Sequence, residues 1–262
     1  MDGFAQDLRF AFRQIARHPS FYAICVTTLA LAIGANAVVF GVFQSVVLEP
    51  LPFAEPDQLV RFYGVKQDQG IDTAGVSPAD AVDYRAGLES FDQLAFYTYY
   101  GLSFTDSARP REITALRVTP GLLAMLGVEP LHGRTFLPGE DQEGSEKVVV
   151  LSHATWQAEL GGDVSRVGGT VRLDEEEWTL AGVMPPDFEF PIGGAGIYVP
   201  MTEAADPRRA ARWLVGLGRL APGVGIAAAE AEAQALAGNL AAEYPADNTG
   251  WSVRLVPLTE TV

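Results

Sequence analysis

The chain of 262 residues has little of what several classes of protein require. It has one cysteine, Cys25, so no disulfide can form within it and its folded part must depend on hydrophobic cores. It has two lysines, Lys66 and Lys147, and neither follows a glycine in the Gly-x-x-x-x-Gly-Lys-Ser/Thr loop that binds nucleotide phosphates. The sequence therefore predicts no ATP-binding site of that type.

Positive charge is also scarce. The chain has 18 Lys and Arg against 33 Asp and Glu, a net charge of −15. Three of the basic and two of the acidic residues lie before Ser20, and no charged residue occurs between Ser20 and Leu48, so the part after the run has a net charge of −16. Without a basic surface that displaces counterions from phosphates, the chain is not expected to bind nucleic acid.

Side chains that could bind a metal or carry out catalysis are few and scattered. His18, His132 and His153 have no second histidine or cysteine at ligand spacing. The segment around Ser77 resembles a nucleophile elbow only in outline, because Pro78 has no N–H for an oxyanion hole. We interpret Ser77 as a helix cap.

Two acidic tracts, at residues 140–143 and 174–177, lack the alternating ligands and the glycine of a calcium loop. We interpret both as solvated turns. The sequence thus indicates no catalytic residue, no metal ligand and no cofactor, and the protein is not expected to be an enzyme.

The longest uncharged run extends from Ser20 to Leu48. Because about 20 apolar residues cross the hydrocarbon core of a bilayer, residues 20–48 are predicted to form a transmembrane helix. A cleaved signal peptide is one alternative, since Ala35-Asn36-Ala37 fits a cleavage site, and a buried helix of a soluble domain is another. The run continues well past Ala37, which favours a membrane anchor.

The flanks of the run predict its orientation. Arg9, Arg13 and Arg17 precede it, whereas acidic residues follow it. By the positive-inside rule the N-terminus is cytoplasmic, and residues 49–262 lie outside the cytoplasm of a single-pass protein of the inner (cytoplasmic) membrane. Residues 1–19 are predicted to form an amphipathic cytoplasmic elbow, which either contacts a partner or lies on lipid headgroups.

Small residues recur at three- and four-residue spacing within the run. Such a stripe lets helices approach closely in lipid, and Asn36 beside it adds a polar group that favours a neighbouring helix. We therefore expect this span to pack against further helices. The predicted packing residues are Ala23, Thr27, Ala30, Gly34, Asn36, Ala37, Gly41 and Ser45.

The remainder has the pattern of an α+β domain. Helix starts are predicted at Ser77 and Ser152, and residues 170–183 are predicted to form a hairpin with the acidic tip 174–177. A strand, a long Ala-rich helix and a strand between residues 213 and 256 indicate a split βαβ unit. Two subdomains are predicted: a βαβ-rich one, about 58–110 plus 208–257, and a β-rich insertion, about 111–207.

Several separate motifs, in order and spread from about Leu8 to Val256, resemble one family. The first group is Arg13-Gln14, His18-Pro19-Ser20-Phe21, the run from Leu29 to Asn36, and Leu51-Pro52-Phe53. The second is Ser77-Pro78-Ala79-Asp80 with Tyr84-Arg85, Leu126-Gly127-Val128, the run from Gly133 to Phe136, the run from Val149 to Ser152 with Trp156, and the run from Gly182 to Pro185. Together they resemble MacB/FtsX-like ABC transporter permeases, most closely the acidobacterial-type duplicated permeases.

The resemblance implies a MacB-like periplasmic core domain in residues 49–262, attached to the first span of a permease that serves transport such as efflux. It implies as partners the lipid bilayer, the remaining permease spans or a second permease copy, a separate ABC ATPase subunit, and a periplasmic partner protein. Because the family has further spans where this sequence ends, the chain is expected to be a truncated permease that does not transport alone. The alternative is a freestanding single-span sensor or adaptor that binds an envelope partner.

Overall fold

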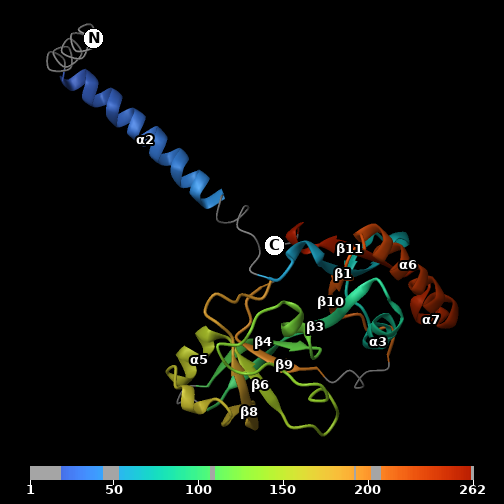
Figure 1. The fold of residues 1–262 in the computed structure, drawn as a ribbon. Coiled ribbons are helices and arrows are strands. Elements are labelled where there is room, and N and C mark those ends of the chain that lie inside the picture. The colour runs from blue at the N-terminus through green and yellow to red at the C-terminus, as the bar shows by residue number, and fades with distance from the viewer. Residues whose placement is uncertain (1–18, 44–52, 107–109, 192, 202–207, 261–262) are drawn as a thin grey trace. The chain divides into compact units, whose positions relative to one another are not determined.

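The computed structural model describes residues 19–43, 53–106, 110–191, 193–201 and 208–260. The chain divides into two compact units, Met1–Leu51 and Pro52–Val262. In the first unit the described part is one helix, α2 (Pro19–Phe43), shown in blue in Figure 1. It lies on the predicted span, and residues 19–37 have the length and hydropathy to cross a membrane.

The second unit is built on one mixed sheet and confirms the predicted α+β class. Its strand order is β11-β1-β10-β3-β4-β9-β6-β8-β5, with β2 paired to β1 and β7 paired to β3 and β8. The strands are β1 (Leu59–Lys66), β2 (Ile71–Ala74), β3 (Phe91–Phe104), β4 (Arg111–Val118), β5 (His132–Gly133), β6 (Val148–Leu151), β7 (Thr170–Leu173), β8 (Glu176–Val183), β9 (Ile197–Pro200), β10 (Val215–Leu220) and β11 (Ser252–Pro257).

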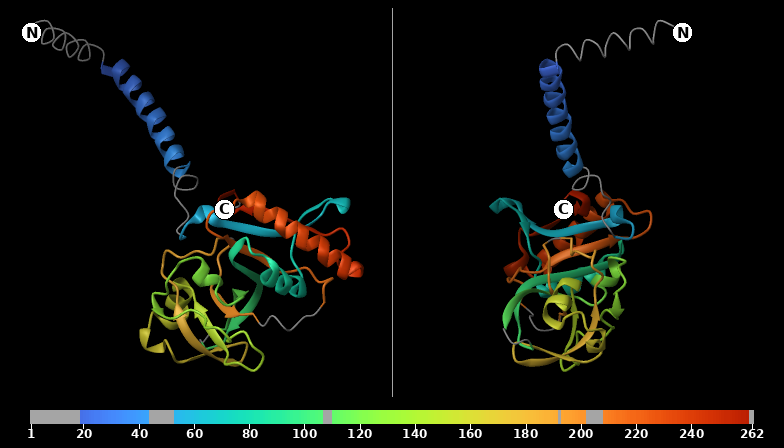
Figure 2. Two further views of the ribbon diagram at one scale, coloured as in Figure 1. Left: turned by 45° about the vertical axis from the view of Figure 1, so that its right-hand side comes forward. Right: turned by 90° about the vertical axis from the view of Figure 1, so that its left-hand side faces the viewer.

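The helices cover parts of this sheet. They are α3 (Pro78–Gly87), α4 (Leu122–Met125), α5 (His153–Leu160), α6 (Ile226–Glu243) and α7 (Pro245–Asn248), with short 3-10 turns η2 (Pro56–Gln58), η3 (Gln67–Gln69), η4 (Val164–Arg166) and η6 (Leu258–Glu260). Figure 2 shows the strands β1 and β10 with α6 at one end of the domain, and the yellow segments that contain α5 at the other.

The predicted split βαβ unit is confirmed. β10 and β11 both pair with β1 in antiparallel register, so they run parallel to each other with β1 between them. α6 connects them and buries Ala229, Ala233, Ala237 and Leu240. The three alanines recur every four residues, so this face of the helix can lie close to the sheet.

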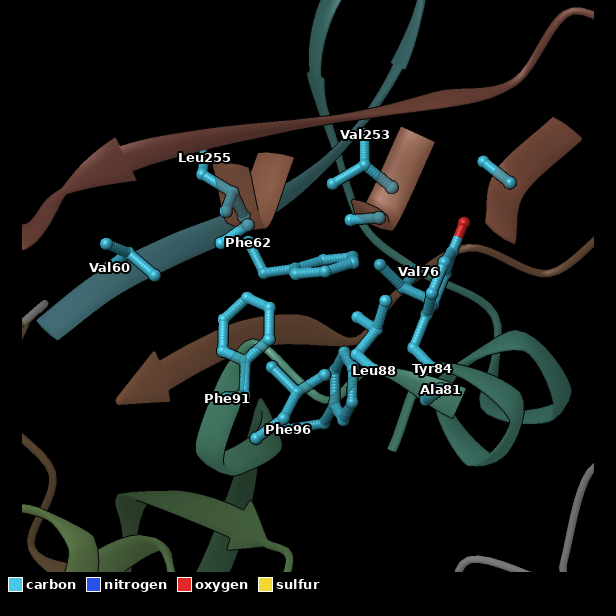
Figure 3. Close-up of a cluster of buried hydrophobic side chains, with 14 of the residues drawn as sticks. Val60, Phe62, Val76, Ala81, Tyr84, Leu88, Phe91, Phe96, Val253 and Leu255 are labelled. Carbon is cyan, nitrogen blue, oxygen red and sulfur yellow. The ribbon is translucent and has the colours of Figure 1, made fainter. Parts of the chain in front are cut away.

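The first hydrophobic core lies between this unit and α3, and Phe62 is at its centre (Figure 3). Its ring centroid is 4.9 Å from that of Tyr84, 6.1 Å from Phe96 and 6.2 Å from Phe91. Tilted aromatic pairs at such distances add to the stabilisation that comes from burial alone.

A second core contains side chains of β4, β6, β7, β8 and β9 with Trp156 of α5. β3 contributes to both cores: Leu94 and Phe96 to the first, and Leu102 and Phe104 to the second. A single 14-residue strand therefore joins the two halves of the domain. The boundaries of the two subdomains, about 58–110 plus 208–257 and about 111–207, remain a prediction.

The predicted hairpin at 170–183 is present, but its tip is shorter than expected. Only Asp174 and Glu175 form the turn, with φ of 48° and 65°, while Glu176 and Glu177 already pair with β7. The prediction of a four-residue acidic tip was therefore wrong, because the exposed Glu176 and Glu177 form the start of β8 and pair with β7. The short strands β2, β5 and β9 were not predicted; their two to four residues are too short to show a period.

α3 begins as predicted, and its first turn anchors a buried polar cluster. The Ser77 side chain accepts from the N–H of Asp80 at 3.1 Å, which confirms the helix cap. The fully buried Asp80 carboxylate accepts from Arg209 at 2.6 Å and from Asn248 at 2.9 Å. Its other oxygen lies 2.9 Å from the Arg212 guanidinium. One carboxylate thus joins α3, α7 and the segment before β10.

Aromatic rings cover the two arginines of the cluster. The guanidinium carbon of Arg209 lies 3.6 Å from the centroid of Tyr244, and that of Arg212 lies 4.2 Å from Trp251. The rings exclude water from the cations while their faces attract them. Asp80 neutralises the mostly buried Arg212, and it shares Arg209 with Asp83, whose carboxylate lies 2.7 Å from that guanidinium.

Replacing Asp80 with alanine would leave these two cations without their shared carboxylate. We expect Asp80→Ala to lower the free energy of unfolding by about 3–5 kcal/mol, the usual cost of breaking a buried ion pair. Arg172→Ala is the matched control, since its partner Glu175 is exposed and 3.7 Å away, and it should cost less than about 1 kcal/mol. Chemical denaturation would measure both, and equal losses would contradict this role of Asp80.

Two glutamates of α6 satisfy backbone groups of the sheet and of a turn. Glu230 accepts from the N–H of Leu255 in the edge strand β11 at 2.7 Å, and Gln234 donates to the carbonyl of Val253 at 3.1 Å. Glu232 accepts from the N–H groups of Glu89 and Ser90, both at 2.9 Å. Helix α6 thus covers the backbone of β11, which protects this edge of the sheet from strand addition.

Glu232 makes the stability of the domain dependent on pH. Burial by itself raises the pKa of this carboxyl, but the hydrogen bonds from Ser90 and from the backbone of Glu89 outweigh it, and the pKa lies below its ordinary value of 4.5. A lowered pKa in the folded state stabilises fully above the ordinary value, and the stabilisation is lost as the pH falls through the lowered pKa.

We therefore expect Glu232→Gln to be less stable than the unsubstituted protein at neutral pH, with the difference narrowing as the pH falls below about 4.5. Thermal unfolding followed over this pH range would measure the difference. Glu129→Gln, at an exposed carboxyl without such hydrogen bonds, is the control and should run parallel to the unsubstituted protein. A Glu232→Gln difference that stays constant with pH would contradict the assignment.

Candidate functional site: where the chain joins the domain

The predicted helix-packing residues lie on α2, where large apolar side chains are exposed within their own unit. Phe21, Ile24, Leu29, Leu31 and Ile33 are each 61–69% exposed. An uncovered apolar helix of this length needs lipid or other helices around it. The exposed apolar side chains are what the prediction of a transmembrane helix requires. They do not test the packing stripe, which remains a prediction.

The stripe residues Ala23, Thr27, Ala30, Gly34 and Ala37 are exposed on α2, and a Cβ added at Gly34 would meet no atom within 4 Å. The side-chain amide of the predicted packing residue Asn36 donates to the carbonyl of Ala32 at 2.9 Å, so its polarity is partly satisfied within the helix. Gly41 lies in α2, and Ser45, Arg9, Arg13 and Arg17 lie outside the described residues.

The histidines of the described part have packing roles. His132 and His153 flank Trp156, with ring centroids 5.3 and 5.6 Å from the indole. Within the described ranges, no group of three or more His, Cys, Asp or Glu side chains is placed to hold a metal ion.

A second buried polar site of the domain lies at its N-terminal segment. We call Phe53–Gln58 the incoming segment. Arg219 of β10, only 9% exposed, donates to the carbonyl oxygens of Ala54 and Met125, both at 2.7 Å, and lies 3.4 Å from that of Glu55. One guanidinium therefore joins the incoming segment, the central sheet and the end of α4.

Close packing adds to this connection. Phe53 is buried, and the N–H of Ala54 donates to the carbonyl of Leu126 at 3.3 Å. A Cβ at Gly127 would lie 2.6 Å from that of Ala54, and Gly127 has φ of +73°, so glycine is required there for two reasons. The predicted motif Leu126-Gly127-Val128 thus lies at the junction.

The C-terminal end of the described part of the domain lies beside the incoming segment. The turn η6 (Leu258–Glu260) contacts η2 of the incoming segment, and Leu258 is fully buried. Immediately inside them, Val60 of β1 pairs with Pro257 of β11. The incoming segment and η6 therefore lie next to two neighbouring strands of the sheet, β1 and β11.

The sequence did not single out Arg219. It occurs in the apolar strand Val215–Leu220, where a charged residue with no neighbour of opposite charge in the strand is itself a signal of a buried partner. Its partners are backbone carbonyl oxygens of segments about 95 and 165 residues away in the chain, which no local pattern identifies. The arrangement connects the incoming segment, β10 and α4 through one side chain.

The domain has the fold of known permease domains. It is similar to a domain of a protein described as a permease from Porphyromonas gingivalis, with a TM-score of 0.57, 19% identity, and coverage of 78% of this chain and 92% of that one. It is similar to the periplasmic region of MacB from Actinobacillus actinomycetemcomitans, with a TM-score of 0.56, 14% identity, and coverage of 78% and 90%.

A third similar structure is the extracellular domain of the noncanonic ABC-type transporter YknZ from Gram-positive bacteria, with a TM-score of 0.54, 12% identity, and coverage of 75% and 99%. No protein of curated function matches the chain. The family model of the MacB-like periplasmic core domain matches residues 22–236, which includes most of α2 and nearly all of the sheet. The chain therefore belongs to the family of MacB-like periplasmic core domains of ABC-type permeases.

Proposed function

We propose that the chain supplies the first span and the extracytoplasmic domain of an ABC-type permease, and that ATP-driven movement of the membrane part reaches the domain through the incoming segment. The observation that carries this proposal is the Arg219 guanidinium, which joins that segment to β10 and α4. The chain itself performs no chemistry in this role, and the ATP is hydrolysed by a separate ATPase subunit.

The mechanism follows from what Arg219 contacts. Its hydrogen bonds reach the incoming segment on one side and the end of α4 on the other, and α4 packs on β3, which enters both cores. A pull on Phe53–Gln58 therefore acts on both halves of the domain, and the domain follows as one body. Substrates or envelope partners outside the cytoplasm would be moved by that body.

Removing the guanidinium should loosen this connection locally. We expect Arg219→Ala to speed hydrogen exchange at the amide of Ala54 and in α4 by about tenfold or more, because hydrogen bonds to a charged group contribute about 1.5–3 kcal/mol. Amides in the middle of α6 should keep their exchange rates. Exchange measured by mass spectrometry, with Arg172→Ala as the control, would check this, and unchanged rates in the incoming segment would contradict it.

The permease role requires partners for α2 and an ATPase. We expect the full chain, purified through a C-terminal tag from its native membrane, to bring with it an ATPase that has a Gly-x-x-x-x-Gly-Lys-Ser/Thr loop and hydrolyses ATP. Gly34→Leu should reduce the recovered ATPase severalfold, because a large side chain on the small-residue stripe prevents close helix contact.

Leu31→Ile, which keeps the size of a residue off the stripe, is the matched control for Gly34→Leu and should recover the ATPase normally. Recovery of the chain without any ATPase would contradict the permease role and would favour a freestanding sensor or adaptor.

The proposed location is the cytoplasmic membrane, with the N-terminus inside. A phosphatase reporter fused after Val262 should be active, because such reporters fold only outside the cytoplasm, and reversing the charge of Arg9, Arg13 and Arg17 together should lower that activity. An inactive reporter on a stably expressed fusion would contradict the orientation.

A further inference from the structure

One face of the sheet carries two arginines on neighbouring strands. The residues of β1 and β11 that point into the first core are Val60, Phe62, Val253 and Leu255 (Figure 3). Because side chains alternate along a strand, Arg61, Tyr63 and Arg254 point to the opposite face. Arg254 is exposed, and Arg61 and Tyr63 are partly exposed, so this face is open to solvent near the β11 end of the sheet.

The two arginines are close enough to act together. Tyr63 pairs with Arg254 across the strands, and Arg61 pairs with Val256, so Arg61 and Arg254 are diagonal neighbours. Such neighbours have Cα atoms about 7–8 Å apart, which is within the reach of long side chains. The guanidinium carbon of Arg61 lies 4.6 Å from the centroid of the Tyr63 ring, so contact with this ring orients the side chain. One small anion can therefore contact both guanidinium groups.

Neither arginine forms an ion pair with an acidic side chain within the part of the chain that the structure describes. Other arginines of the domain do form such pairs, namely Arg111, Arg134, Arg166, Arg172, Arg209 and Arg212. The part of the chain after the span has a net charge of −16, so acidic side chains are plentiful there. The Nε of Arg61 is also buried without a hydrogen-bond partner among the described residues, and a partly buried charge without a counter-ion is costly.

The tyrosines around Arg61 do not neutralise its charge. Burial raises the pKa of Tyr97 and of Tyr99 on β3 above the ordinary value of 10, and the nearby Arg61 guanidinium opposes this rise. Both phenols are therefore neutral at pH 7. An anion would contact the terminal amino groups of Arg61 and Arg254 rather than the buried Nε, and acidic side chains more than about 10 Å away are screened at 0.1 M salt.

We propose that Arg61 and Arg254 together bind a phosphate group. A guanidinium donates two parallel hydrogen bonds to phosphate oxygens, and a phosphate has enough oxygens to accept from two guanidinium groups at once. The phosphate belongs either to a phospholipid headgroup or to a soluble phosphate compound, since both present the same oxygens. Arg61 comes three residues after the incoming segment, which follows the predicted span in the sequence, and a headgroup is therefore the first source to test.

The inference goes beyond the proposed function and does not depend on it. Phosphate binding at this face needs neither an ATPase nor movement of the domain, so one property can fail while the other holds. A bound phosphate group would contact β1 and β11, the two strands beside which the incoming segment and η6 lie.

The test uses the full chain in dodecyl maltoside micelles, with calorimetry as the readout and two phosphate probes. Dioctanoyl-phosphatidylglycerol presents the phosphate on a lipid, and inorganic phosphate presents it alone. We expect saturable binding of at least one probe, and weaker binding as the salt concentration rises. Binding of the lipid alone assigns the site to a headgroup, binding of inorganic phosphate alone assigns it to a soluble compound, and binding of both shows that the phosphate is sufficient. Dioctanoylglycerol, which lacks the phosphate, should not compete with the lipid.

Variants assign the contacts. Arg254→Gln and Arg61→Gln should each weaken binding about tenfold, and Arg61→Lys, which keeps the charge but loses the fork of donors, should weaken it severalfold. Arg117→Gln is the matched control, because Arg117 is an exposed arginine that also contacts a tyrosine ring, that of Tyr100 at 4.3 Å, but it lies on β4. It should bind as the unsubstituted chain does. Thermal unfolding of each variant would establish that it is folded.

The absence of saturable binding with both phosphate probes would overturn the proposal. Full affinity in folded Arg61→Gln and Arg254→Gln would overturn it as well, because the probe would then lie elsewhere. The same holds if Arg117→Gln loses as much affinity as the other two variants, since the binding would then depend on the overall charge and not on this pair.

Discussion

The long strand β3 is the constraint on which the rest of the domain depends, because it belongs to two hydrophobic cores at once. Leu94 and Phe96 pack with α3 and α6, while Leu102 and Phe104 pack in the second half. A strand hydrogen-bonded on both sides cannot slip by one residue without turning every buried side chain outward. The register of β3 with β10 and β4 therefore holds the two halves in a fixed relation.

The two polar clusters connect elements of the domain that the hydrophobic cores alone would leave free to move relative to one another. Asp80 ties α3 to the arginines before β10, and Arg219 ties the incoming segment to α4. Both sites bury charge, which is costly unless every partner is present, so each is satisfied in one arrangement only. In the proposed function, where the domain follows the movement of a membrane part, such connections would transmit that movement to the whole domain.

Much of this fold could be predicted from local patterns. The caps at Ser77 and Ser152 and the Ala-rich helix before Pro245 are set by neighbouring residues, and the structure has all three. The junction could not be predicted, because Arg219 bonds to carbonyl groups of distant segments and carbonyls occur in every residue. Short strands such as β5 exist only because β8 supplies a partner.

The central claim is that the domain moves as one body with the incoming segment when ATP is hydrolysed. Spin-label distances in the complete, ATPase-containing assembly, with Cys25→Ser, test it most directly. The account predicts that ATP changes the distance between labels at Ala23→Cys and Val164→Cys, leaves that between Gln67→Cys and Val164→Cys unchanged, and has a smaller effect on the first pair in Arg219→Ala. An unchanged first distance during ATP hydrolysis, or an equal change in the second, would contradict it.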